Sequence, residues 1–396
     1  MKKFLLSISC AILLLNFSFA QEPEKQQEEA YIFEMIKEVP VTSVKDQHRS
    51  STCWSYSALG FLEAELLRTT GKEYDLSEGF IVYKTYQGKA DKYVRYHGTC
   101  NYSPGGLFHD ISWTWEKYGL MPESAYTGLV NPDTLFIHGE LMSITKGLLD
   151  GVIKNSNRKL SDNWRNAYDG VLNAYFAAPP QEFIYEGIKY TPESFAKSLK
   201  INLEDYVNIT SWTHHPFYTQ FVFELPDNWL NGSIYNVQLD EMVRMIDNAL
   251  ENGYTVAWAA DVSDKGFSWK NGVAIMPDRV IESTSGSDAE HWTGSTKTPD
   301  LYAFDGKVIE KDVDQETRQQ GFDDWTTTDD HGMVLCGIYK DQRGNKFYKV
   351  KNSWGTKSGK YDGYFYVSVP YVKMNTISIM VNKNSVPKDI RKKLDI

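Results

Sequence analysis

A cysteine stands at the predicted entrance of an apolar helix early in the chain, and this pattern restricts the fold most. Leu59, Leu62 and Leu66 recur at helical spacing after Cys53, and Gly71 is the expected end of the helix. A helix N-terminus carries partial positive charge and unpaired N–H groups, which favour a thiolate over a thiol. The sequence therefore predicts a helix that presents a reactive thiol at its first turn.

Two polar residues far downstream of Cys53 and one upstream are of the types that nucleophilic catalysis by a thiol requires. His331 opens a predicted strand, Asn352 follows another, and Gln47 precedes Cys53 by a short loop. A histidine can accept the thiol proton, and an asparagine can fix the tautomer of the ring by accepting from its other nitrogen. The amide of Gln47 can donate to an oxyanion together with the backbone N–H of Cys53.

The composition describes a globular protein with a large core. Of 396 residues, 41% are hydrophobic, 14% aromatic and 24% charged, which excludes wholesale disorder. The formal net charge is −10, so a nucleic-acid backbone is not an expected partner.

The first residues have the pattern of an export signal. Two lysines precede an apolar run over 4–15, and Ala20 offers a small residue for cleavage. We expect a cleavable signal peptide over 1–20, a short charged leader over 21–29, and a periplasmic or secreted protein. No other stretch approaches 18 apolar residues, so the mature chain is not expected in the membrane.

Cysteine usage supports a reactive thiol. Once the signal is removed, Cys53, Cys100 and Cys336 remain, an odd number in a chain expected to be exported. Cys336 lies in an apolar strand and is predicted to be part of the core. The state of Cys100, and a disulfide between it and Cys336, stay open.

The order of the predicted elements indicates an α+β protein. A second helix is expected over 239–250, followed by a buried strand over 254–258. Strand-like runs over 333–339, 346–350 and 363–369, separated by turn signals, predict an antiparallel sheet. The middle of the chain has helix-like but interrupted patterns, with Thr191-Pro192 as a clear helix start.

The chain resembles the papain-like cysteine peptidases. The resemblance rests on Gln47 and Cys53-Trp54 at the family's spacing, the later histidine at a strand start, and the run Asn352-Ser353-Trp354-Gly355. Further agreement comes from residues 43–47, from a Leu-Ser-Glu turn over 76–78, and from Pro-Gly-Gly-Leu over 104–107.

The resemblance implies the following roles. Cys53 is the nucleophile, His331 the general base and acid, Asn352 the residue that orients it, and Gln47 the oxyanion donor. Gly105 and Gly106 form the edge where a substrate backbone docks, and Trp54 and Trp354 support the site. The expected substrates are peptides, with no cofactor. His214-His215 has no acidic or cysteine ligand at suitable spacing, so it is interpreted as a loop and no metal site is predicted.

Three features resemble the bleomycin hydrolase/aminopeptidase C branch in particular. Ser50 replaces a disulfide cysteine, the leader is too short for an inhibitory prosegment, and about 130 extra residues separate Cys53 from His331. We therefore expect a two-lobed fold: a helical left lobe over 30–130, a helical insertion over 131–235, and a β-rich right lobe over 236–396 that ends in a strand and a helix. The branch forms hexamers, which makes a homo-hexamer an expectation by resemblance.

One departure leaves the activity open. Members of the branch have a C-terminal arm that reaches the cleft and captures the free amine of a substrate, whereas this sequence stops at Ile396, before such an arm. Aminopeptidase activity is the first hypothesis. An endopeptidase or broad peptidase with an open cleft is the second, and a non-catalytic binding or assembly protein of the same fold is the third.

Overall fold

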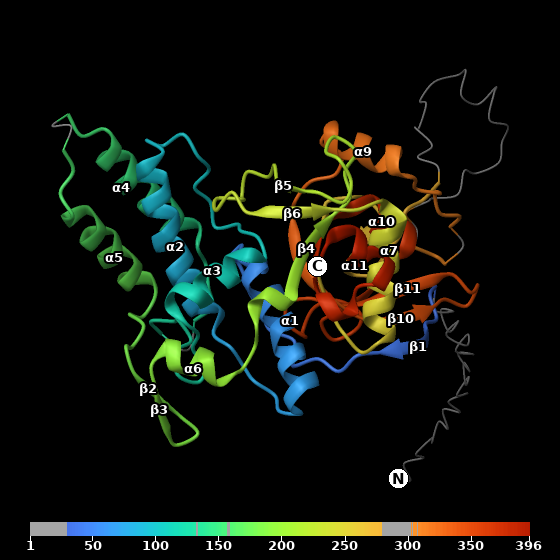
Figure 1. Cartoon of the computed structure of the whole chain (residues 1–396), viewed down its shortest axis with the longest axis horizontal. Coiled ribbons are helices and arrows are strands. Elements are labelled where there is room, and N and C mark those ends of the chain that lie inside the picture. Colours follow the sequence, from blue (N-terminus) through green and yellow to red (C-terminus); the bar gives the residue numbers. More distant parts are fainter. Residues whose placement is uncertain (1–29, 132–133, 157–158, 279–301, 303, 307) are drawn as a thin grey trace, which may run out of the picture.

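The computed structural model describes residues 30–131, 134–156, 159–278, 302, 304–306 and 308–396. The signal predicted over 1–20 and the leader predicted over 21–29 lie outside the described residues. Figure 1 shows helices gathered in one half of the molecule and a large sheet in the other, with α1 between them. Among the described helices, none combines the length and the apolarity that a membrane crossing requires.

The helical lobe is built around α1 and α2, and one hydrophobic core joins its helices. Its elements are α1 (Cys53–Thr70), α2 (Glu78–Arg95), α3 (His109–Tyr118), α4 (Gly139–Ile153), α5 (Asn163–Tyr175), the hairpin of β2 (Phe183–Tyr185) and β3 (Ile188–Tyr190), and α6 (Pro192–Ser198). As predicted, α1 begins at Cys53, and Gly71 ends it with φ 70° and an N–H bonded to the Leu67 carbonyl.

The second lobe is one large, mostly antiparallel sheet. Its strands lie in the order β5-β6-β4-β13-β7-β10-β11-β12-β9-β8, and β1 pairs with β10. They are β1 (Glu34–Glu38), β4 (Tyr206–Thr210), β5 (Gln220–Val222), β6 (Ser233–Asn236), β7 (Val256–Ala260), β8 (Phe267–Ser268), β9 (Val273–Ala274), β10 (His331–Lys340), β11 (Lys346–Lys351), β12 (Tyr364–Ser368) and β13 (Thr376–Asn382). The predicted α+β fold class, with a helical lobe and a β-rich lobe, is thus confirmed.

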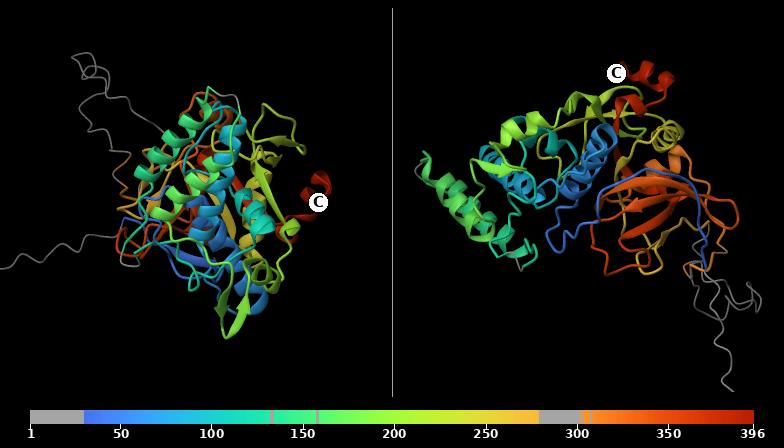
Figure 2. Two further views of the ribbon diagram at one scale, coloured as in Figure 1. Left: turned by 90° about the vertical axis from the view of Figure 1, so that its left-hand side faces the viewer. Right: turned by 90° about the horizontal axis from the view of Figure 1, so that it is seen from below.

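Helices cover both faces of this sheet. The remaining helical elements are α7 (Leu239–Glu251), α9 (Gln315–Asp323), α10 (Val369–Asn375), α11 (Lys388–Leu394) and two short 3-10 turns, η1 (Leu203–Asp205) and η2 (Lys383–Ser385). In β7, Val256, Trp258 and Ala260 point into the core shared with α7, whereas Ala257 and Ala259 point toward α1. The view from below in Figure 2 shows α1 between the helical lobe and the sheet.

The segment 131–235, expected to be a helical insertion, contains both helices and strands. Its first half forms α4 and α5, and Thr191 caps α6 in a capping box with Ser194. Its second half supplies β4, β5 and β6, and β4 pairs with β13 from the end of the chain. A strand of five residues such as β4 shows too few alternations of apolar and polar residues to be predicted from periodicity. Its formation depends on pairing with β13, which is remote in the sequence.

Candidate active site

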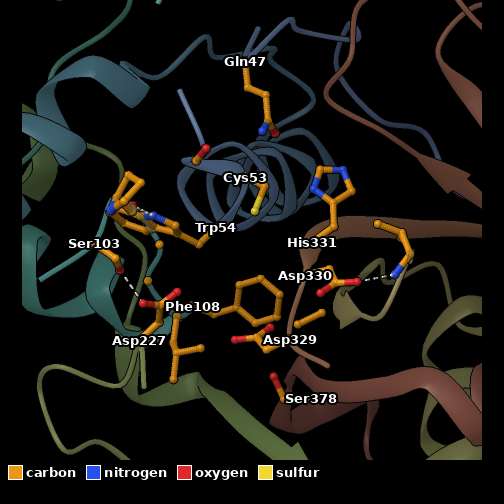
Figure 3. Close-up of a pocket in the computed structure, with 18 of the residues that line it drawn as sticks. Gln47, Cys53, Trp54, Ser103, Phe108, Asp227, Asp329, Asp330, His331 and Ser378 are labelled. Carbon is orange, nitrogen blue, oxygen red and sulfur yellow. Dashed lines mark hydrogen bonds between the residues drawn. The ribbon is translucent and has the colours of Figure 1, made fainter. Parts of the chain in front are cut away.

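A cleft of about 360 Å³ lies where the helical lobe meets the sheet. Its walls come from the start of α1, from the loop before α3, from the segment between β5 and β6, and from the first residues of β10. Figure 3 shows Cys53 in the middle of this cleft, with Gln47 on one side and His331 beside it. The cleft contains most of the residues that the sequence analysis selected: Gln47, Cys53, Trp54, Gly105, Gly106, His331 and Trp354.

Cys53 is the first residue of α1, so its thiol lies at the positive end of the helix. Burial raises the pKa of this thiol to about 12, although hydrogen bonds from the backbone of Gly332 and Trp54 act in the opposite direction. The charges of Asp329 and Asp227 raise this pKa further. Burial thus opposes the thiolate that the helix N-terminus favours, so a nearby base is needed to accept the thiol proton.

His331 and Asn352 are brought together by the pairing of β10 and β11. His331 begins β10, Asn352 follows β11, and the strands are antiparallel with Val334 opposite Lys351. The His331 Nε2 and Asn352 Oδ1 atoms are 2.7 Å apart. Because an amide oxygen only accepts, Nε2 carries the proton and Nδ1 has the free lone pair.

Two further properties suit His331 to proton transfer. The ring stacks on Trp354, with centroids 4.7 Å apart, so the indole shields one face of the imidazole from water. Burial lowers the His331 pKa to about 4, although the hydrogen bond with Asn352 acts in the opposite direction. The imidazole is thus neutral at physiological pH, and in Figure 3 one of its nitrogens faces Cys53.

The orientation of the Gln47 amide is set by Ser353. The Ser353 hydroxyl donates to the side-chain oxygen Oε1 of Gln47 at 2.7 Å, and the backbone N–H of Gln47 donates to the backbone carbonyl of Ser353 at 2.9 Å. Since Oε1 is occupied, the NH₂ group is the end of the amide that is available to the cleft. In the sequence, Ser353 stands out only as part of the run Asn352-Ser353-Trp354-Gly355, and no local signal indicates its contact with Gln47.

The glycine pair forms a second wall beside Trp54. The Trp54 indole donates to the Pro104 carbonyl at 3.0 Å, and a Cβ at Gly106 would approach its ring to 2.9 Å. Only glycine fits there without displacing the indole. Gly105 and Gly106 consequently lie next to Cys53-Trp54, where the resemblance placed the docking edge for a substrate backbone.

Three carboxylates in the cleft were not anticipated from the sequence. Asp329 and Asp330 directly precede His331, and Asp227 comes from the distant segment between β5 and β6. Burial, assisted by the charges of Asp227 and Asp330, raises the Asp329 pKa to about 7. Proximity of Asp329 to His331 in the sequence was available as a signal, whereas the position of Asp227 follows only from the fold.

The other residues considered from the sequence lie elsewhere. His214 and His215 do meet an acidic side chain in the fold: Glu224, whose carboxylate lies 3.0 Å from His214 Nε2. Ile396 packs against the core that contains α7 and is not among the residues lining the cleft. Cys100 and Cys336 are free thiols, and Cys336 is buried as predicted.

Comparisons with known proteins agree with this fold. The family model of the papain family cysteine proteases matches residues 32–133, and that of the Peptidase C1-like family matches residues 281–396. Aminopeptidase C from Lactobacillus delbrueckii subsp. lactis is 23% identical, over 90% of this chain and 83% of the relative. "Cysteine proteinase 1, mitochondrial" from Saccharomyces cerevisiae is 22% identical, over 93% of this chain and 80% of the relative.

A solved structure shares most of the architecture. The crystal structure of PepW from Lactobacillus rhamnosis superimposes with a TM-score of 0.67 at 19% identity, and the match covers 91% of this chain and 84% of that one. The two family-model matches, one at each end of the chain, support a papain-like cysteine peptidase. The relatives named above support the branch of aminopeptidase C and bleomycin hydrolase, which the sequence resemblance also implied.

Proposed function

We propose that this protein is an exported aminopeptidase that hydrolyses peptide bonds through Cys53, His331 and Asn352. The observation that carries the proposal is the meeting, in one cleft, of a thiol at a helix N-terminus, a neutral imidazole held by an amide oxygen, and an amide NH₂ group. These groups are what acyl transfer to a thiol requires. The similarity to aminopeptidase C supports the exopeptidase assignment.

Acylation begins when His331 Nδ1 accepts the Cys53 proton and the sulfur attacks the scissile carbonyl carbon. The Gln47 NH₂ group and the Cys53 backbone N–H donate to the oxyanion of the tetrahedral intermediate. His331 then gives the proton to the leaving amine as the C–N bond breaks, which leaves a thioester on Cys53.

Deacylation repeats these steps with water. His331 accepts a proton from the water as its oxygen attacks the thioester carbonyl, and the C–S bond breaks. The proton returns to Cys53, which regenerates the thiol and releases a carboxylic acid. Asn352 keeps Nε2 protonated throughout and so keeps Nδ1 available as the base.

Hydrolysis of fluorogenic peptide amides under reducing conditions tests the proposal. The wild-type protein is expected to hydrolyse amides with a free N-terminal amine, and Cys53→Ala to lose this activity. Cys100→Ala is the matched control, because it removes a free thiol outside the cleft and is expected to leave the rate unchanged. Full activity in Cys53→Ala would refute the thiol mechanism.

Two further parts of the proposal rest on the sequence and its resemblance. Export predicts cleavage of the chain after Ala20, and mass spectrometry of the protein recovered from its native cells tests this prediction. Assembly into a hexamer follows the behaviour of the branch. Sizing of the purified protein distinguishes a hexamer from a monomer of about 45 kDa.

A further inference from the structure

The segment 223–232, between β5 and β6, forms part of the cleft wall and is firmly anchored to the helical lobe. The Trp229 indole donates to Asp110 Oδ2 in α3 at 2.8 Å and packs edge-on against Trp113 with centroids 5.0 Å apart. Within the segment, the Asn228 amide donates to the carbonyls of Phe223 and Gly232 at 2.7 and 2.9 Å. These contacts hold Asp227 at a fixed position.

One oxygen of the Asp227 carboxylate is occupied and the other faces the cleft. Oδ1 accepts from Asn101 Nδ2 at 2.6 Å and from the Ser103 hydroxyl (Figure 3). Oδ2 has no hydrogen-bond partner within the part of the chain that the structure describes. It lies directly over Gly105, where a Cβ would come within 1.8 Å of it.

This carboxylate limits the edge on which a substrate backbone can dock. The carbonyl of Gly105 already accepts from the buried Lys89 ammonium. The N–H and the carbonyl of Gly106, in contrast, have no partner among the described residues, so they can pair with an extended peptide. A peptide paired with Gly106 therefore meets Asp227 at the next position. The residue paired with Gly106 is then the N-terminal one, and the scissile bond follows that residue or the next.

The negative charge at this end of the cleft favours a positively charged group of the substrate over a neutral one. Asp227 and Asp329 both line the cleft, and no Lys or Arg is among the described lining residues. The Lys89 ammonium lies behind Gly105 and is occupied by the carbonyls of Ser103 and Gly105. A neutral acyl cap would leave Oδ2 desolvated and unpaired, whereas an ammonium group provides both a donor and the opposite charge.

We propose that Asp227 binds the free α-ammonium group of the substrate and closes the cleft beyond it, so that the enzyme removes one or two residues from the N-terminus of a peptide. This inference rests on the peptidase function proposed above. It assigns amine recognition to a side chain of the segment 223–232.

The test compares peptide amides with a free amine and the same amides N-acetylated, for the wild type and two variants. Asp227→Asn keeps the contacts to Asn101 and Ser103 but removes the charge, so the KM of free-amine substrates should rise by about tenfold or more. Asp227→Ala also removes the obstruction over Gly105, so N-acetyl substrates should be hydrolysed faster than by the wild type. Glu224→Gln is the control, since it alters an exposed carboxylate of the same segment that does not line the cleft.

The outcomes separate this inference from the proposed function. A wild-type preference for free amines that falls in both Asp227 variants, but not in Glu224→Gln, supports the inference. The same preference in the wild type and both Asp227 variants overturns it, as does equal hydrolysis of both substrate sets by the wild type. Absence of any hydrolysis by the wild type, under conditions in which the protein is folded, refutes the peptidase function itself.

Discussion

Ser353 gives the Gln47 amide one orientation out of two. An unconstrained glutamine can present either its oxygen or its NH₂ group to the cleft, and only the NH₂ group stabilises an oxyanion. The 2.7 Å hydrogen bond from the Ser353 hydroxyl to Oε1 selects the productive orientation before substrate arrives. Because Ser353 follows Asn352, one short segment orients both the general base and the oxyanion donor.

This arrangement predicts different effects for two alanine variants. Gln47→Ala removes the donor itself and should lower kcat by about 10²–10³-fold. Ser353→Ala removes only a neutral hydrogen bond that orients the amide, so kcat should fall by roughly fivefold. Neither variant should change KM much, because the oxyanion forms after binding. Steady-state kinetics with a free-amine peptide amide measure both; an unchanged kcat in Gln47→Ala would exclude Gln47 from the reaction.

At the scale of elements, the sequence predicts the helix and strand boundaries that local patterns determine. The start of α1 at Cys53, its end at Gly71, the start of α6 at Thr191-Pro192 and the strand that opens with His331 follow from local periodicity and capping residues. Antiparallel pairing of neighbouring strands then brings His331 and Asn352 together.

Contacts between segments that are remote in the sequence cannot be predicted from local periodicity and capping residues. Strand β4 exists because β13, about 170 residues later, offers it a partner. Asp227 reaches the cleft because Trp229 of the same segment inserts between α2 and α3, a contact with no local sequence signal. The function of Ser353 depends equally on a partner, Gln47, from the other end of the chain.

A buried ion cluster fixes the segment that carries Gln47 to the helical lobe. The Lys45 ammonium lies 3.0 Å from Glu63 of α1 and 2.7 Å from Glu78 of α2. Burial opposes the charge on Lys45, but Glu78, Glu63 and Asp75 together raise its pKa well above the ordinary value. Burial raises the Glu78 pKa, and the positive charge of Lys45 opposes this rise. The cluster is therefore stable only while the ammonium is present.

Replacing Lys45 with methionine should destabilise the fold. Removal of the cation takes away the nearest counter-charge of the buried Glu63 and Glu78 carboxylates, and the free energy of unfolding should fall by about 3 kcal/mol. The matched control is Arg244→Met, which breaks the half-exposed pair with Asp389 and should cost less than about 1 kcal/mol. Urea unfolding of the three proteins measures the difference. Equal stability of Lys45→Met and wild type would show that the cluster has no net effect on stability.

At the scale of the whole molecule, the cleft collects acidic groups from segments that are remote in the sequence. Asp329 and Asp330 come from the loop before β10, whereas Asp227 comes from the segment between β5 and β6. The Asp330 carboxylate accepts from the backbone N–H groups of Val262 and Ser263, so it has a structural function. Asp329 has no hydrogen-bond partner among the described residues, and its charge is available to the space beside Asp227.

The raised pKa of Asp329 makes the binding of an amine depend on pH. Asp329 is neutral below its pKa of about 7 and anionic above it, and the groups that share its surroundings are Asp227, Asp330, Cys53 and His331. As pH rises from 6 to 8, the added negative charge should lower the KM of free-amine substrates severalfold. His331, with a pKa of about 4, stays neutral over this range and should not alter kcat.

The variant Asp329→Asn tests whether ionisation of Asp329 causes the fall in the KM of free-amine substrates. The variant cannot ionise at this position, so its KM for free-amine substrates should not fall between pH 6 and 8. The α-amine of the substrate itself loses its proton near pH 8, but this loss affects both proteins equally and cancels in their ratio. N-acetyl substrates, which have no charge to bind, should show no such fall in either protein. If the fall in KM persists in Asp329→Asn, the titrating group is another one, and the charge near Asp227 does not vary with pH in the way inferred here.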